Sequence, residues 1–186
     1  MEKLILIKFY ILTFISLFLI NCTQPEKENS NGIEIIFTEL LNKNSYYNFN
    51  NPMDTTTWHF GCIKKDIEYI GSVFSMPSIT INDSIPVAIF DEYSFEEIIT
   101  IPENFENNIV TPSSLEYKDE CIGLDEDNCD FENEVLHYDI THHRLEISNP
   151  MRCYIFILEE KSYKLQFLEY SSVNSGSLLF IYSEIN

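Results

Sequence analysis

Residues 153–182, CYIFILEEKSYKLQFLEYSSVNSGSLLFIY, contain the clearest structural pattern in the chain. In the first six of these residues, and again in residues 164–169, successive side chains alternate with a period of two, which is typical of β-strands. A polar turn separates the two segments, and a polar loop then leads to a last apolar segment at residues 178–182. This end of the chain therefore predicts antiparallel strands joined by short connections.

The rest of the chain adds shorter strand-like segments. They are rich in Tyr, Phe and Ile, which favour strands, and polar turns separate them: residues 46–49, 58–62, 67–69, 73–81 and 87–90. Pro77 predicts a bulge or a break, residues 95–99 fit a single helical turn, and residues 33–41 fit either a strand or a helix. Many short strands with polar turns predict an all-β fold, either an antiparallel sandwich or a barrel-like meander.

The composition limits the partners of the folded part, residues 33–186, which has the size of one domain. The chain has a formal net charge of −19, which disfavours nucleic acid and anionic lipid surfaces as partners. The sequence has no Gly-x-Ser-x-Gly, no His-Glu-x-x-His and no glycine-rich phosphate loop. We therefore expect a protein that is not an enzyme.

The N-terminus has the features of an export signal. Lys3 and Lys8 provide positive charge, and residues 9–20 form an apolar run that is too short for a stable membrane-spanning helix. The run ends in LINC, residues 19–22, which resembles the lipobox of bacterial lipoproteins. In that motif a lipidating enzyme and the lipoprotein signal peptidase act at the cysteine, here Cys22.

This pattern predicts a bacterial lipoprotein. Residues 1–21 would be removed as the signal peptide, and Cys22 would carry acyl chains such as palmitate that anchor the protein to a membrane. Residues 22–32 would form a flexible tether, because the residues after the cysteine are polar. The acidic tether is similar to those of surface lipoproteins of the Bacteroidota. We therefore expect an outer-membrane anchor at the cell surface, with the periplasmic face as the alternative.

Four further cysteines follow Cys22, and an exported protein encounters oxidising conditions. Cys121 and Cys129 flank an acidic loop and are close in sequence, so we expect a local disulfide between them. Cys62 and Cys153 would then form a second disulfide that closes a much longer loop. Four free buried thiols are the alternative.

Several segments resemble the HmuY-like haem-binding lipoproteins of the Bacteroidota. Residues 58–67, WHFGCIKKDI, are similar to the tryptophan-led strand of that family, and residues 138–143, YDITHH, are similar to its Tyr-Asp-x-x-Thr-His turn. Residues 163–170, YKLQFLEY, are similar to its most specific C-terminal block. The resemblance implies an all-β monomer that takes up haem, holds the iron between two axial histidines or methionines, and passes it to an outer-membrane haem transporter.

The resemblance suggests three candidate axial ligands. His137 is the first, because it alternates with Tyr138 on a predicted strand. His142 falls on the Thr-His turn, where a hydrogen bond to the backbone is the alternative role. Met151 is the third, although a methionine often only fills a core. His59 stands beside the strand's tryptophan, where we expect a structural role.

The sequence also departs from the family. Between Met76 and His137, where one axial ligand is expected, there is no histidine or methionine. The region contains instead an acidic loop, residues 119–134, whose carboxylates lack the spacing of a calcium loop. Two functions remain open. The protein binds haem or a related ligand for uptake, or it is a surface interaction module that has kept the fold and lost haem binding.

Overall fold

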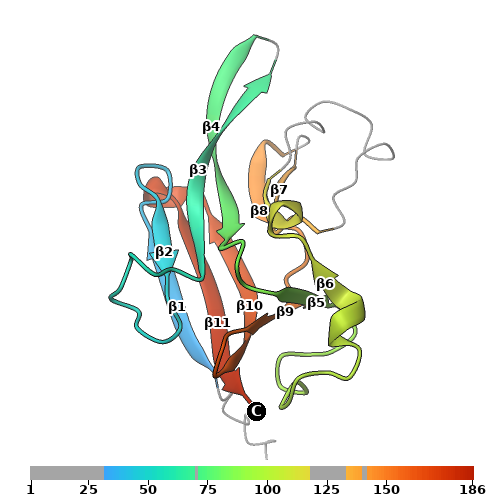
Figure 1. The fold of residues 1–186 in the computed structure, drawn as a ribbon. Coiled ribbons are helices and arrows are strands. Elements are labelled where there is room, and N and C mark those ends of the chain that lie inside the picture. The colour runs from blue at the N-terminus through green and yellow to red at the C-terminus, as the bar shows by residue number, and fades with distance from the viewer. Residues whose placement is uncertain (1–31, 70, 118–132, 140–141) are drawn as a thin grey trace, which may run out of the picture. The chain divides into compact units, whose positions relative to one another are not determined.

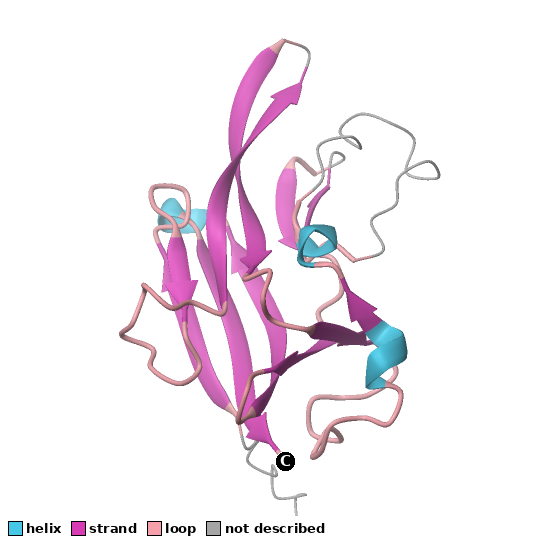
Figure 2. Cartoon of the chain, in the orientation of Figure 1, coloured by secondary structure: helices cyan, strands magenta, loops and turns pink. Residues whose placement is uncertain are grey.

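The antiparallel strands expected at the C-terminal end lie at the centre of the domain. The computed structural model describes residues 32–69, 71–117, 133–139 and 142–186, and residues 31–186 form one compact unit. The fold is all-β, with short 3₁₀ turns at Phe105–Asn108, Pro112–Leu115 and Val173–Ser175 (Figure 2). The strands are β1 Ile33–Thr38, β2 Ser45–Tyr47, β3 Phe60–Tyr69, β4 Ser72–Ile81, β5 Val87–Phe90, β6 Ile109–Val110, β7 Leu136–Asp139, β8 Arg144–Ile147, β9 Cys153–Ile157, β10 Ser162–Ser171 and β11 Ser177–Ile185.

These strands form three antiparallel sheets (Figure 1). The largest has six strands in the order β1-β11-β10-β9-β5-β6, and a second has the order β2-β3-β4. Strands β7 and β8 form a separate two-stranded hairpin. Strands β3 and β4 are long, and their far ends project beyond the other strands of the domain (Figure 1).

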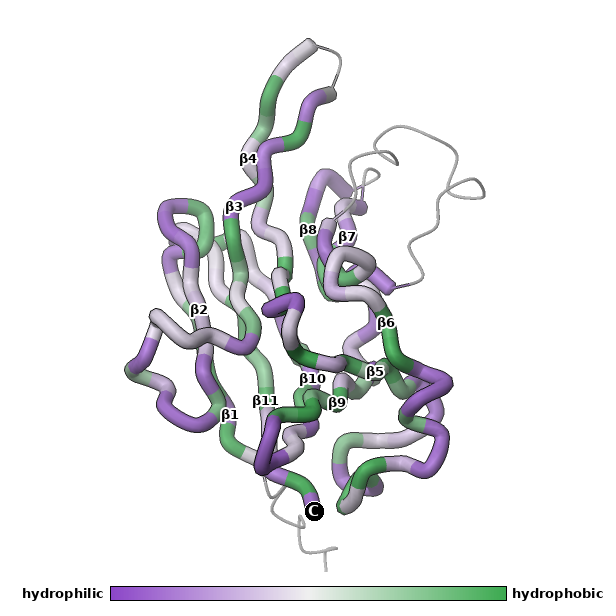
Figure 3. Tube along the Cα trace, viewed as in Figure 1, coloured by the Kyte–Doolittle hydropathy of each residue, from purple (hydrophilic) through white to green (hydrophobic). Residues whose placement is uncertain are grey.

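The main core fills the space between the six-stranded and three-stranded sheets. Phe60 of β3 is fully buried, and its ring lies 5.1 Å from that of Phe180 and 6.0 Å from those of Phe156 and Phe167, all on the larger sheet. Hydrophobic residues are frequent along the strands, whereas many turns are hydrophilic (Figure 3). The all-β prediction is confirmed, and of the two arrangements that the sequence left open the domain has the β-sandwich.

The opposite face of the six-stranded sheet packs against a second cluster. Phe95, Ile98 and Phe105 from the segment after β5 cover Cys153 and Ile155 of β9. Polar side chains of β10 also face this layer, and backbone oxygens accept their hydrogen bonds, which offsets the cost of burying them. The Lys164 ammonium donates to Phe95 O at 2.5 Å, and Gln166 donates to Pro150 O at 2.7 Å.

Most of the expected strands are confirmed, with two changes at their ends. Residues 33–38 form a strand and not a helix; this strand, β1, pairs with β11. Strand β3 begins at Phe60, because Trp58 and His59 belong to the preceding loop. That loop forms one wall of a cavity.

The expected break at Pro77 does not occur. Strand β4 runs without a register shift and pairs Pro77 with Lys64. Because β4 is an edge strand, the missing N–H of proline costs no ladder hydrogen bond on its open side. The irregularity lies instead in β10, between Phe167 and Glu169. Residues 95–99 contain a turn and no helix.

The expected disulfide between Cys62 and Cys153 is wrong, because both thiols are free and buried. Cys62 lies in the core between the sheets, whereas Cys153 lies in the cluster on the other face of the six-stranded sheet. Burial raises the pKa of each thiol to about 12, so both stay protonated. Cys22, Cys121 and Cys129 lie outside the described residues. In the part of the chain that is described, no helix has the length and apolarity needed to cross a membrane.

Candidate functional site

A cavity of about 1260 Å³ lies where five segments from distant parts of the chain meet. Its lining comes from the start of β1, the loop before β3, the β4–β5 connection, the β9–β10 turn and the end of β11, and includes Ile33, Phe49, Asn50, Thr56, Thr57, Trp58, His59, Asn82, Ser84, Ile85, Pro86, Leu158, Glu159, Glu160, Lys161, Tyr163, Tyr182 and Glu184. It therefore contains aromatic, acidic and amide groups together.

Hydrogen bonds within the loop of residues 48–58 hold one wall of the cavity in place. Asn48 Oδ1 accepts from the backbone N–H groups of Asn50 and Asn51 at 2.8 and 3.0 Å. The Asp54 carboxylate accepts from the hydroxyl groups of Thr57 and Thr56, and these bonds hold the pKa of Asp54 well below its usual range. Since the loop satisfies its own polar groups, this wall exists before any ligand arrives.

Stacked aromatic rings form part of the cavity wall. The ring of Phe49 stacks with that of His59, at 5.4 Å and an interplanar angle of 27°, and with that of Tyr163, at 4.7 Å and 11°. The Tyr163 hydroxyl donates to Asn50 Oδ1 at 2.9 Å, which fixes the outer member of the stack. Trp58, half-buried, lies 5.2 Å from the ring of Tyr46. These rings give the cavity flat apolar surfaces.

His59 has a defined tautomer. Its Nδ1 accepts a hydrogen bond from the backbone N–H of Phe49 at 3.0 Å. Nδ1 therefore carries no hydrogen, and in the neutral ring the hydrogen is on Nε2. Burial lowers the pKa of His59, which favours the neutral form. His59 can thus donate to a ligand through Nε2, but it does not present an unprotonated Nε2 to a metal ion.

The rim of the cavity is acidic. Glu159 and Glu160 are exposed and belong to the β9–β10 turn. Lys161, the next residue, forms a 2.6 Å ion pair with Glu184, and this contact raises the pKa of its ammonium group. Because Lys161 and Glu184 neutralise each other, the carboxylates of Glu159 and Glu160 give the rim its net negative charge.

The predicted haem ligands lie elsewhere, and none of them lines the cavity. His137 is half-buried on β7, opposite Glu146 of β8. His142 is exposed in the turn of the same hairpin, where its Nδ1 contacts Asp139 Oδ2 at 2.5 Å. Met151 is 61% exposed in the turn before β9. The structure thus brings the two histidines onto one hairpin and leaves Met151 on a separate turn.

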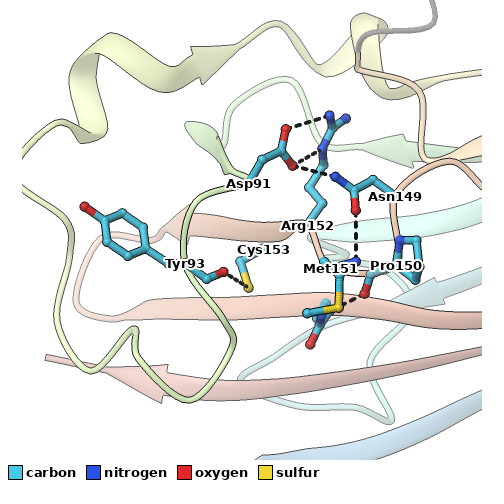
Figure 4. A network of polar contacts seen from close by, with 8 residues as sticks. Asp91, Tyr93, Asn149, Pro150, Met151, Arg152 and Cys153 are labelled. Atoms are coloured by element: carbon cyan, nitrogen blue, oxygen red, sulfur yellow. Dashed lines mark hydrogen bonds and ion pairs between the residues drawn. The ribbon is translucent and has the colours of Figure 1, made fainter.

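An ion pair fixes the turn that contains Met151 (Figure 4). The buried guanidinium of Arg152 donates to both oxygens of Asp91, at 2.7 and 2.9 Å. Asn149 donates to Asp91 at 3.0 Å and accepts from the backbone N–H of Met151 at 3.0 Å. The network ties the turn to the end of β5, which is a structural role.

Haem fits the described residues only in part. The Asp139 carboxylate on Nδ1 of His142 would leave Nε2 free to bind iron, as in many metal-ligating histidines. A porphyrin also needs an apolar cleft, and the cavity found among the described residues has neither His137 nor His142 in its wall. Within the same residues, no group of three or more His, Cys, Asp or Glu side chains could hold a metal ion.

Comparison of the chain with models of known protein families, with curated proteins and with solved structures found no match. Sequence reasoning missed Phe49, Tyr163 and Glu160 as site residues, because each lies in a different segment. The signal that could have pointed to them is the concentration of aromatic and acidic residues next to turns.

Proposed function

We propose that this chain is a lipoprotein, anchored through Cys22 to the outer membrane of a bacterium, whose β-sandwich binds a ligand in the cavity beside Phe49 and His59. The observation that supports binding is the cavity itself. Its volume of about 1260 Å³ is at or above the range of small-molecule sites. Its aromatic stack and loop wall are braced by internal hydrogen bonds, so little ordering cost opposes binding.

A thermal-shift screen tests this proposal. The mature protein, residues 22–186, would be made with Cys22→Ser so that no acyl chain is attached, and screened against sugars, amines, organic acids and ferric haem. A ligand at about 100 times its Kd stabilises the folded state by about 2.7 kcal/mol. For a domain of this size, that corresponds to a rise in Tm of roughly 5–10 °C.

Two variants locate the binding. Trp58→Ala should abolish the shift, because Trp58 lines the cavity. Phe74→Ala should keep it, because Phe74 is 52% exposed on β4 and does not line the cavity. A screen without any stabilising compound, or a compound that stabilises Trp58→Ala as much as the parent, would contradict the proposal.

Haem binding on the β7–β8 hairpin is the second candidate, and the Asp139–His142 contact favours it. Ferric haem should then give a sharp low-spin Soret spectrum at one-to-one stoichiometry. His137→Ala or His142→Ala should convert it to a five-coordinate spectrum, and His143→Ala should not. A broad Soret shift that albumin competes away would contradict haem binding on the hairpin. Only the cavity proposal would then remain, and if the screen also failed, a surface interaction module.

A further inference from the structure

The charge of the cavity rim disfavours anions. Three carboxylates, those of Glu159, Glu160 and Glu184, face one ammonium group, that of Lys161. The lysine is already paired with Glu184 at 2.6 Å, and the whole chain has a formal net charge of −19. A phosphate ester or a carboxylate such as a haem propionate would meet repulsion here. The ligand of this cavity is therefore neutral or cationic.

The hydrogen-bond donors of the cavity then distinguish a neutral ligand from a cationic one. His59 presents a hydrogen on Nε2, because its Nδ1 is used by the backbone of Phe49. Asn50 uses its Oδ1 for the Tyr163 hydroxyl, which leaves its amide nitrogen as a donor. An ammonium or guanidinium group has no acceptor for the Nε2–H of His59, so a cation that covered this half-buried donor would leave it without a partner. The ligand must bring acceptors as well as donors.

A hydroxyl group both donates and accepts hydrogen bonds. The several hydroxyl groups of one ligand can accept from His59 and Asn50 and donate to the carboxylates of Glu159 and Glu160, neither of which forms an ion pair among the described residues. The C–H faces of a sugar ring pack on flat aromatic surfaces such as that of Trp58. The cavity volume of about 1260 Å³ exceeds the roughly 300–1,000 Å³ of a drug-sized site, which leaves room for more than one ring.

We propose that the cavity formed by Trp58, His59, Asn50 and the Glu159-Glu160 turn binds a neutral carbohydrate chain of two or more sugar units. This inference rests on the proposed function, because it names the class of ligand that the binding protein takes. It does not require haem binding on the β7–β8 hairpin.

The test is isothermal titration of the mature Cys22→Ser protein against a panel of neutral oligosaccharides. The panel contains hexaoses of α-1,4-, β-1,4- and β-1,3-linked glucose, of β-1,4-xylose and of β-1,4-mannose, with a neutral glycan array alongside. At least one should bind saturably, with a Kd of roughly 10 μM to 1 mM. Trp58→Ala should weaken that binding about tenfold or more, and Phe74→Ala should leave it unchanged.

A charge-removing variant distinguishes sugar from cation. In Glu159→Gln/Glu160→Gln the side-chain oxygens still accept hydrogen bonds, so sugar affinity should change less than about threefold. Spermidine, the cationic probe, should not compete with the sugar; spermidine binding at the cavity that this variant and Trp58→Ala both remove would overturn the carbohydrate proposal. Failure of every neutral glycan to bind a protein with native circular dichroism overturns the carbohydrate proposal. If another compound class then still gives a thermal shift that Trp58→Ala removes, the proposed function stands without it; if none does, both fail.

Discussion

Replacing Phe60 with alanine should remove a large part of the stability of the domain. The ring of Phe60 is fully buried, and six aromatic rings from both sheets lie 5.1 to 6.0 Å from it. Such a tightly surrounded site cannot collapse around the lost side chain, so a cavity remains. Phe→Ala in a core costs about 3–5 kcal/mol, out of a total free energy of unfolding of about 5–15 kcal/mol. The fall in Tm should be roughly 6–20 °C.

The matched control is Phe74→Ala. Phe74 lies on β4 of the same hairpin but is 52% exposed, so its removal should change the free energy of unfolding by less than about 1 kcal/mol. Urea unfolding monitored by the fluorescence of Trp58, the single tryptophan, measures both variants. Equal losses for the two variants, or a loss below about 1 kcal/mol for Phe60→Ala, would refute the packing of β3 against the six-stranded sheet.

Three further predictions concern other parts of the chain. Cys22→Ser should abolish palmitate labelling and detergent partition; continued labelling would place the acylation elsewhere. Asp91→Ala should cost about 1–3 kcal/mol in urea unfolding, because it leaves the buried Arg152 without its carboxylate, whereas the exposed Glu92→Ala should be near neutral. Burial lowers the pKa of His59, so protonation favours the unfolded chain and stability falls as the pH drops through 6.5. His59→Gln should flatten that pH dependence, and an unchanged slope would contradict the assignment.

The alternating sequence predicted the strands because alternation reports which faces of a strand are buried. It worked well for β10, where Tyr163, Leu165 and Phe167 face the inter-sheet core. It was misleading where both faces are covered. Lys164 is a charged residue that alternates with apolar ones, yet only 5% of it is accessible, since the segment around Phe95 covers this face of the sheet. Burial on the second face depends on a loop that has no periodic pattern.

The cavity could not be predicted in the same way, because its residues share no segment. Trp58 and His59 were assigned to a strand, although they end a loop that hydrogen bonds from Asn48 hold in place. Glu160 and Tyr163 lie at the β9–β10 turn, and only the sheet order places that turn beside the loop. Turn residues from distant segments meet through topology, which side-chain periodicity does not encode.

His59 shows how one side chain contributes both to the fold and to the cavity. The hydrogen bond from the backbone of Phe49 to Nδ1 is structural, in agreement with the role expected from the sequence. That same bond fixes the hydrogen on Nε2 and so determines what the cavity offers to a ligand. Protonation would put a hydrogen on Nδ1 and break the bond to Phe49, but Nε2 would remain a donor. Acid therefore acts on the loop of residues 48–58, and thereby on the shape of the cavity, while the Nε2 donor is kept.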